Sequence, residues 1–393
     1  MSTQSLQQQF QVTFSYTVHF TEGLFQADNP LLAEVLSQDG SEGPRKVFFV
    51  LDSGVVDHRP GLEAEILRYV DAHAAVLRLS GPITIIPGGE QCKNEPALLQ
   101  QLLEAVDTYH IDRHSYIIGL GGGAVLDLVG YVASVAHRGI RHIRIPTTVL
   151  SQNDSGIGVK NSVNAFGKKN FLGNFTPPYA VLNDAQFLLT LEDRDWRGGI
   201  AEALKVGLIK DATFFRFIQE NASRLAARHL PTMQYLIHRC AELHLQHIAG
   251  PDPFEQGSSR PLDFGHWSAH KLEQLSHFRL RHGEAVAIGI ALDSTYSCLQ
   301  GRLSGAELEQ ILDVIRTLGF ALYAPEMAEQ LEDATHPQSL LRGLQEFREH
   351  LGGCLTVMLL EKIGRGVEVH EMDNALLMEA VRQLREYQPA VIC

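Results

Sequence analysis

The sequence has few of the features that mark secreted, membrane-spanning or nucleic-acid-binding proteins. Its five cysteines are dispersed and include no Cys-x-x-Cys pair, which is typical of free thiols in a reducing cytoplasm rather than of a disulfide framework. The N-terminal residues MSTQSLQQQF lack the basic start and apolar core of a signal peptide. No apolar run reaches transmembrane length. We therefore expect a cytoplasmic protein.

Basic residues are also fewer than acidic ones: the sequence has 33 Lys and Arg against 46 Asp and Glu, which gives a formal net charge of -13. This acidic balance argues against a nucleic-acid partner and against an anionic membrane surface. A phosphorylated small molecule stays possible, since such a site needs only a few local cations. The length of 393 residues, 45% of them hydrophobic, is enough for two domains with cores of their own.

The N-terminal half alternates short apolar strands with helical segments. Residues 10–19 alternate apolar and polar side chains, which predicts a strand at a sheet edge. The run VFFVLD at 47–52 predicts a strand buried on both faces, and ITIIPGGE at 83–90 predicts another. Helical patterns at 61–73 and 95–108 separate these strands. This order is typical of βαβ units and a parallel sheet.

Beyond about residue 190 the pattern changes to long amphipathic segments, which predict helices. The expected fold is an α/β Rossmann-like domain over residues 1–187 followed by an all-α domain over 188–393, with the boundary near Leu188. A cleft between two such closely joined domains is the expected place of the functional site.

A glycine-rich segment, GLGGG at 119–123, joins a strand ending at Ile118 to a helix beginning near Val125. Glycines at this position let backbone N–H groups approach a pyrophosphate at a helix N-terminus, although a plain tight turn has the same composition. Asp52, at the end of the first buried strand, is placed either to hold ribose hydroxyls or to cap a turn. The two signals together favour a dinucleotide.

A histidine-rich stretch follows in the helical half. His266 and His270 are four residues apart and share one helix face, and His282 opens the next apolar helix. Earlier, Glu202 lies one helical turn before Lys205. Two imidazoles and a carboxylate with one open position form a catalytic zinc set, whereas packed or solvated histidines are the alternative.

Residues 146–173 form a basic, polar segment that we expect to be a loop. Its clustered cations and amides suit a phosphate monoester and sugar hydroxyls, and a solvated surface loop is the alternative, favoured for Lys168. The side chains concerned are Asp154, Lys160, Asn164, Lys168, Lys169 and Asn170.

Together these segments resemble the sugar phosphate cyclase superfamily, of which 3-dehydroquinate synthase is the best-known member. The resemblance spans about residues 45 to 365 and keeps six blocks in order: GGGAVLDLVGYVASVAHRGI, IPTTVLSQNDSGIGVKNSVN, GKKNFLGNF, IAEALKVGLI, LDFGHWSAH and LRHGEAVAIGI. It implies tightly held NAD, one Zn²⁺ (or Co²⁺) and a homodimer.

By position, the resemblance implies three groups of site residues. The metal ligands are Glu202, His266 and His282. The residues around NAD are Asp52, Glu90, Lys93, Gly122, Gly123, Asp127, Thr147, Thr148, Lys169, Thr190 and Leu191. The catalytic residues are Asp154, Lys160, Lys205 and His270, with Asn170 also at the substrate and Arg138 reaching the phosphate from the partner subunit.

The implied reaction oxidises a ring alcohol, eliminates phosphate, returns the hydride, opens the ring and closes a carbocycle by an intramolecular aldol step. The ion polarises the alcohol oxygen, NAD is regenerated in each turnover, and His270 is a candidate for moving protons.

The sequence departs from 3-dehydroquinate synthases where these bind a substrate carboxylate. His244 falls at the position of their lysine, and Asp263 falls at the position of their asparagine. Their arginine position falls at Ser258 or Ser259, beside Arg260, and their C-terminal lysine position falls at His350. A carboxylate facing Asp263 would meet like-charge repulsion. We therefore expect a neutral seven-carbon substrate of the sedoheptulose 7-phosphate type. The alternatives are a genuine 3-dehydroquinate synthase, a metal- and NAD-dependent alcohol dehydrogenase and a non-catalytic binding protein.

Overall fold

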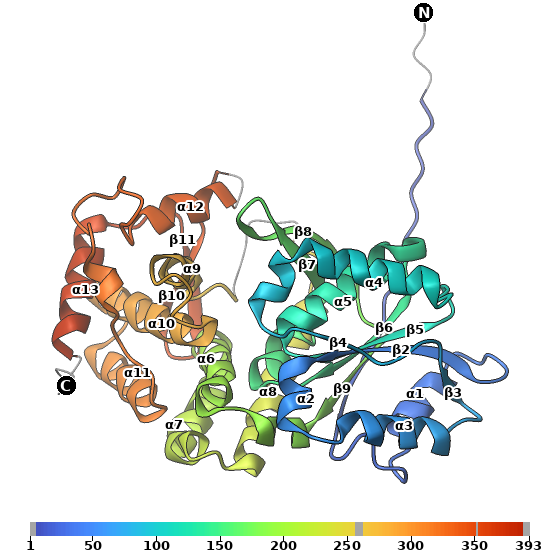
Figure 1. Cartoon of the computed structure of the whole chain (residues 1–393). Coiled ribbons are helices and arrows are strands. Elements are labelled where there is room, and N and C mark those ends of the chain that lie inside the picture. Colours follow the sequence, from blue (N-terminus) through green and yellow to red (C-terminus); the bar gives the residue numbers. More distant parts are fainter. Residues whose placement is uncertain (1–4, 256–261, 351–352, 388–393) are drawn as a thin grey trace, which may run out of the picture.

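The computed structural model describes residues 5–255, 262–350 and 353–387, except for the side chain of His350. An α/β half and a mainly helical half lie side by side (Figure 1). Within the described ranges, no helix has the length and apolar character needed to cross a membrane.

A seven-stranded sheet forms the centre of the α/β half, and all its strand pairs are parallel. Its strands are β1 (Thr17–Thr21), β2 (Arg45–Asp52), β3 (Leu77–Leu79), β4 (Thr84–Ile86), β5 (Tyr116–Gly121), β6 (Arg141–Pro146) and β9 (Ala180–Asp184). Their order is β1-β9-β6-β5-β2-β3, with β4 also paired to β2. The predicted parallel sheet and the buried strand at 47–52 are confirmed.

Helices cover both faces of this sheet, as Figure 1 shows. The elements of this half are α1 (Leu31–Ser37), α2 (Ser53–His58), α3 (Leu62–Ala72), α4 (Pro96–Thr108) and α5 (Gly123–Val135), with the short turns η1 (Glu90–Asn94), η2 (Ala136–Arg138), η3 (Ser151–Ser155) and η4 (Ala185–Thr190). Separate apolar clusters fill the two faces. The chain leaves β2 toward β3 and β4, then returns on its other side as β5. Open α/β sheets bind ligands at such a switch point, at the carboxyl ends of the strands.

The helical half is built around α10, which is buried over most of its length. Its helices are α6 (Asp193–Lys210), α7 (Ala212–Ala226), α8 (Leu230–Ile248), α9 (His266–Leu275), α10 (His282–Leu299), α11 (Gly305–Thr317), α12 (Arg342–His350) and α13 (Asn374–Tyr387), with the short turn η5 (Pro325–Ala328). It also contains an antiparallel hairpin, β10 (Val357–Lys362) and β11 (Arg365–Val369), which the helical pattern did not predict. A turn at Gly364, with φ of 84°, joins these strands.

Two predicted elements were wrong in extent or type. The strand expected at 10–19 is confined to Thr17–Thr21, because its partner β9 has only five residues. Residues 5–16 form no strand and leave the domain as an extended, exposed arm (Figure 1). The loop expected at 146–173 contains η3 and an antiparallel hairpin, β7 (Lys160–Ala165) and β8 (Lys168–Phe175). The expected boundary near Leu188 falls within η4.

Candidate active site

Three helices of the helical half bring Glu202, His266 and His282 together. One ligand atom of each lies within 4.8 Å of the others. Nε2 of His266 is 3.5 Å and Nε2 of His282 is 3.3 Å from Oε1 of Glu202. Glu202 is only 1% exposed, so its carboxylate needs cationic partners at this depth.

Close backbone packing holds these helices at the required separation. Gly265 precedes His266 in a left-handed conformation (φ 77°), and a Cβ there would lie 2.8 Å from the backbone nitrogen of Ile290. A Cβ on Gly283, next to His282, would clash with the carbonyl oxygen of Gly198 on α6. Both metal-ligand candidates therefore stand beside glycines that allow one backbone to approach another.

The second ring nitrogen of each histidine is also engaged. Nδ1 of His266 lies 3.1 Å from the carbonyl oxygen of Phe264, and Nδ1 of His282 lies 3.2 Å from Oε2 of Glu273. With a proton on Nδ1, each ring can present the lone pair of Nε2 to a metal ion held beside Glu202, as metal-binding histidines do. The donor set therefore fits a divalent ion with one open position.

Glu273 did not figure among the predicted site residues. It lies seven residues after His266 and three after His270, so the spacing His-x-x-x-His-x-x-Glu placed it on the same helix face. Burial would raise the pKa of Glu273, but hydrogen bonding and charge from His282, with the charge of Lys169, lower it to about 2.

Lys205 completes the charge balance around Glu202. Burial would raise the pKa of Glu202, yet Lys205 and His266 hold it well below its usual range. Burial would conversely lower the pKa of Lys205, and the charges of Glu202 and Asp154 raise it. Both side chains are buried and form an ion pair, which keeps an ammonium group beside the metal-ligand cluster.

His270 lies at the exposed mouth of the cluster, with its ring centroid 5.6 Å from that of His266. Desolvation and the neighbouring rings of His266 and His282 lower the pKa of His270. A neutral imidazole at this place can accept a proton from a bound molecule.

Asp154 and Asp263 add two carboxylates to the same region. Asp154 lies in the turn η3, and its carboxylate is 2.9 Å from Nδ1 of His244. Burial would raise the pKa of Asp154, but His244 lowers it. The negative charge of Asp263 contributes to the raised pKa of Lys205. The backbone carbonyl oxygen of Asp263 accepts a hydrogen bond from the backbone N–H of His266.

The glycine turn differs in detail from its prediction. The strand continues to Gly121 rather than ending at Ile118, because Gly119 and Gly121 pair with β6. Gly122 and Gly123 then begin α5, two residues earlier than the predicted start. A Cβ on Gly123 would clash with the hydroxyl oxygen of Ser155 and lie 3.2 Å from its Cβ, so a side chain here would require Ser155 to shift.

Free polar groups surround this turn. Thr147 Oγ1 and Ser155 Oγ are buried without a hydrogen-bond partner in the part of the chain that the structure describes. Thr147 is tied to the turn by its backbone, which donates to the carbonyl oxygen of Gly121, and the Thr148 and Ser151 hydroxyls contact each other. Unpaired hydroxyls beside a helix N-terminus fit a pyrophosphate group.

Asp52 lies at the carboxyl end of β2, beside the turn. Its carboxylate accepts a hydrogen bond from the backbone of Gly54 at 2.9 Å and so caps α2. Burial raises the pKa of Asp52, and a Cβ on Gly88 would clash with its carboxylate. The structure thus shows Asp52 as the cap of α2. Its contact with the ribose of NAD stays a prediction.

Several other predicted positions join a network behind the turn. Nζ of Lys93 is buried, 2.7 Å from Asp127 and 3.0 Å from the hydroxyl of Ser162, and it also contacts the side-chain oxygen of Asn170. Asn164 donates to Glu90 at 2.9 Å. The network fastens the hairpin β7–β8 to η1 and α5. At the domain junction, Thr190 caps η4 and Leu191 packs against the helical core.

Three predicted cations lie on the surface. Lys160 pairs with Glu255 at 2.7 Å, and Lys168 is exposed over the ring of Phe171. Arg138 is exposed in the turn η2. It follows α5, whose 13 residues separate it from the glycine turn by about 20 Å. Arg138 is therefore remote from the glycine turn of its own chain. Arg260 and the side chain of His350 lie outside the described residues.

Arg144 is a residue of the site region that sequence patterns did not indicate. Its buried guanidinium donates to the carbonyl oxygens of Gly156, Gly158 and Lys160, at 2.7 to 3.2 Å. It therefore holds the segment between Asp154 and Lys160 in place. Arg144 is one of several basic residues in the strand RHIRIP, and nothing in that pattern distinguishes it for this role.

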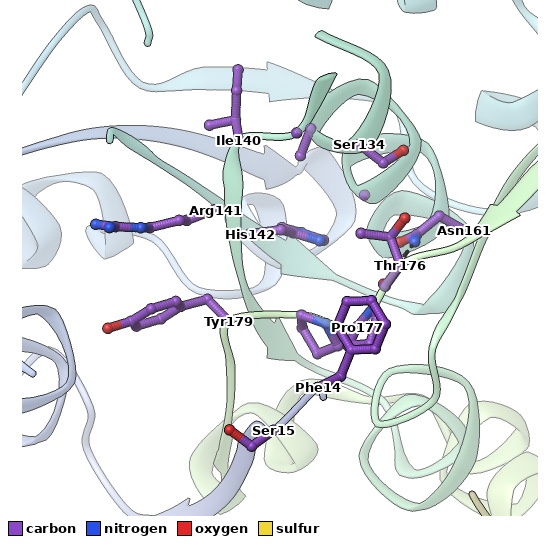
Figure 2. A pocket seen from close by; sticks show the side chains of 14 residues that line it. Phe14, Ser15, Ser134, Ile140, Arg141, His142, Asn161, Thr176, Pro177 and Tyr179 are labelled. Atoms are coloured by element: carbon purple, nitrogen blue, oxygen red, sulfur yellow. Dashed lines mark hydrogen bonds between the residues drawn. The ribbon is translucent and has the colours of Figure 1, made fainter. Parts of the chain in front are cut away.

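A separate pocket of about 300 Å³ lies at the root of the N-terminal arm (Figure 2). Phe14 and Pro177 line it together with Tyr179 and Ile140. None of the predicted site residues contributes to its lining.

Asp293, wholly buried in α10, supports the turn that carries His266. It accepts hydrogen bonds from Nε1 of Trp267 at 2.9 Å and from the backbone of Gly265 at 3.0 Å. Burial raises its pKa to about 7, against about 4 in an unfolded chain. The contribution of Asp293 to stability is thus greatest below about pH 4 and is lost as the pH rises to about 7.

We expect Asp293→Asn to remove this pH dependence. Each pH unit below the folded pKa corresponds to about 1.4 kcal/mol, so the wild type should lose roughly 2–3 kcal/mol relative to the variant between about pH 5 and 7. Urea unfolding of both proteins across that range measures the difference. A constant gap between them would show that Asp293 does not titrate there.

Comparison with known proteins adds three findings. Residues 83–198 match the family model described as 3-dehydroquinate synthase N-terminal, and residues 199–337 match 3-dehydroquinate synthase C-terminal. A 3-dehydroquinate synthase of Nitrosococcus oceani is 35% identical over 75% of this chain and 79% of its own length. A 2-epi-5-epi-valiolone synthase of Actinomyces sp is 31% identical over 97% of both chains.

Among solved structures, a 2-epi-5-epi-valiolone synthase from Streptomyces hygroscopicus subsp. jinggangensis 5008, with NAD⁺ and Zn²⁺ bound, superimposes with a TM-score of 0.84 at 29% identity. The match covers 98% of this chain and 100% of that structure.

Proposed function

Because the chain belongs to the 3-dehydroquinate synthase family of sugar phosphate cyclases, we propose that it uses NAD and a divalent ion to convert a neutral seven-carbon sugar phosphate, of the sedoheptulose 7-phosphate type, into a carbocycle. The main observation behind this proposal is that a negative charge, that of Asp263, lies in the region of the metal-ligand cluster. The family resemblance implies an asparagine of 3-dehydroquinate synthases at Asp263 and a lysine at His244, and His244 is here paired with Asp154. Neither residue offers a free cation to a substrate carboxylate.

Each group of side chains in the site has a role that this reaction requires. Glu202, His266 and His282 would hold Zn²⁺ or Co²⁺, which supplies a Lewis acid for an alcohol oxygen. Lys205 stays charged against Glu202 and can stabilise negative charge that develops nearby. His270 is exposed at the mouth and can exchange protons with substrate. The glycine turn, with Thr147 and Ser155, would bind the pyrophosphate of NAD.

A phosphate-release assay with two substrates tests the proposal. We expect turnover of sedoheptulose 7-phosphate and little turnover of the carboxylated substrate of 3-dehydroquinate synthase. Turnover of the carboxylated compound alone would show that the chain is a genuine 3-dehydroquinate synthase. NADH absorbance, recorded in the same cuvette, should stay flat because the hydride returns within each cycle, whereas an alcohol dehydrogenase would accumulate NADH.

We also propose a homodimer in which Arg138 reaches the phosphate site of the partner. Arg138 forms no ion pair with any described residue and lies far from its own glycine turn. The extended arm supports a second contact surface, since Phe10 and Val12 are 80% and 60% exposed. Residues 5–16 contain no charged side chain that would keep the arm from pairing with another chain. Light scattering should give twice the mass of one chain.

Subunit mixing tests the shared site. Arg138→Ala and Lys205→Ala should each lose most activity when expressed alone. Co-expressed, random pairing makes half of the dimers mixed, and each mixed dimer contains one intact site, so about a quarter of wild-type activity should return. Failure of the mixed preparation to recover activity would place Arg138 outside the partner's site.

A further inference from the structure

Glu273 connects the metal-ligand cluster to the α/β half of the molecule. It lies on α9, is 5% exposed, and occupies the helix face that also carries His266 and His270. A carboxylate this deeply buried has to have each oxygen paired.

The two oxygens of Glu273 contact different halves of the protein. Oε2 lies 3.2 Å from Nδ1 of His282, on α10. Oε1 lies 3.3 Å from Nζ of Lys169, on β8, although Lys169 is 104 residues away in the sequence. In Figure 1 the hairpin β7–β8 reaches from the α/β half toward the helices of the other half.

The hairpin is anchored on its other side as well. Asn170, next to Lys169, contacts Nζ of Lys93, and Lys93 pairs with Asp127 on α5. Adjacent residues of β8 are thus fastened in opposite directions, one to the helix that follows the glycine turn and one to the support of a metal ligand. The result is a continuous polar connection from Asp127 to His282 across the two halves.

We propose that Glu273 is a positioning residue for His282, and that Lys169 holds Glu273 in place, so that metal affinity depends on how the β7–β8 hairpin is seated. This inference rests on the metal site of the proposed function. Without Lys169, one buried oxygen of Glu273 loses its partner and the carboxylate can turn away from His282. Loss of a hydrogen-bond partner behind a ligating histidine typically weakens metal binding by about 10- to 100-fold.

The hairpin provides a matched control. Lys168 is the preceding residue and an exposed lysine, and it lies over the ring of Phe171. Lys168→Met and Lys169→Met therefore make the same chemical change on the same strand, but only the second removes the partner of Glu273. Lys169→Arg keeps a cation at the position and should restore binding.

The measurement is the Zn²⁺ dissociation constant of the full-length protein, obtained by competition with a chromophoric chelator. Glu273→Gln and Lys169→Met should weaken Zn²⁺ binding by about 10- to 100-fold, whereas Lys168→Met should stay within about twofold of wild type. The double variant Glu273→Gln/Lys169→Met should bind no more weakly than the weaker single variant, since both substitutions break one connection. The absorption spectrum of the Co²⁺ form should shift in the same variants, which reports ligand geometry independently of turnover.

Equal affinities of the Lys168→Met and Lys169→Met proteins, or fully additive losses in the double variant, would overturn the inference. The melting temperature of metal-free Lys169→Met should equal that of the metal-free wild type, which would show that the substitution causes no folding defect. The outcome is separable from the proposed reaction: metal affinities can follow the expected pattern in a protein that does not act on sedoheptulose 7-phosphate. Absence of Zn²⁺ binding by the wild type would instead contradict the metal site itself.

Discussion

Replacing His282 by alanine should remove the bound metal ion and lower phosphate release by at least about 1,000-fold. His282 is one of only three side chains that form the predicted ligand set, and its Nε2 lies 3.3 Å from Glu202. Loss of Lewis-acid stabilisation worth about 4 kcal/mol corresponds to that factor. Metal content by elemental analysis and phosphate release from sedoheptulose 7-phosphate, measured on the same preparation, would quantify both losses.

His114→Ala is a suitable control, because His114 is exposed and lies before β5 in the α/β half. The control should keep its metal and its activity. If the His282→Ala protein retained a full equivalent of metal, the ligand assignment would be wrong, and an active, metal-free variant would contradict a metal-dependent oxidation.

Asp263→Asn should raise kcat/KM for the carboxylated substrate of 3-dehydroquinate synthase by roughly 10- to 100-fold. The substitution removes a negative charge that acts on Lys205 and introduces the amide that the family resemblance implies for those synthases. Repulsion between two carboxylates at close range is worth about 1.4–3 kcal/mol when partly screened by a neighbouring ammonium. Steady-state kinetics with the neutral and carboxylated substrates give the ratio directly.

The matched control for this change is Asp313→Asn, since Asp313 is an exposed carboxylate paired with Arg316 on α11. It should leave the ratio of the two kcat/KM values unchanged. Adding His244→Lys to Asp263→Asn should increase the preference for the carboxylated substrate further, because a lysine provides the missing cation. No change in the ratio for either variant would mean that other residues select the substrate.

Some features of this protein follow from local sequence. The apolar run of β2, the glycines before α5 and the periodic helices of the second half each reflect contacts within a short stretch of chain, and all three are present in the structure. The shared helix of His266 and His270 and the start of the next helix at His282 were predictable for the same reason. Glu202 entered the metal-site hypothesis as the carboxylate one helical turn before Lys205, and the family resemblance matched it to a metal ligand.

Other features depend on contacts between distant residues. Glu202 and His282 are 80 positions apart, and their approach requires a glycine at 283 to lie against Gly198. The pairing of His244 with Asp154 and the bonds of Arg144 to three carbonyl oxygens likewise join separate elements. The basic segment at 146–173 looked like a loop, because its strands are stabilised by pairing with each other and by the Lys93 network rather than by apolar periodicity.

The sequence by itself therefore determined the sheet, the helices and the residue types available for chemistry, since these depend on local periodicity and backbone preferences. Only the tertiary structure decided which of those side chains meet. It brought Lys169 of one half to Glu273 of the other and placed Arg138 at the opposite end of α5 from the glycine turn. Packing and burial between distant residues set these distances, and such contacts produce no periodic pattern in the sequence.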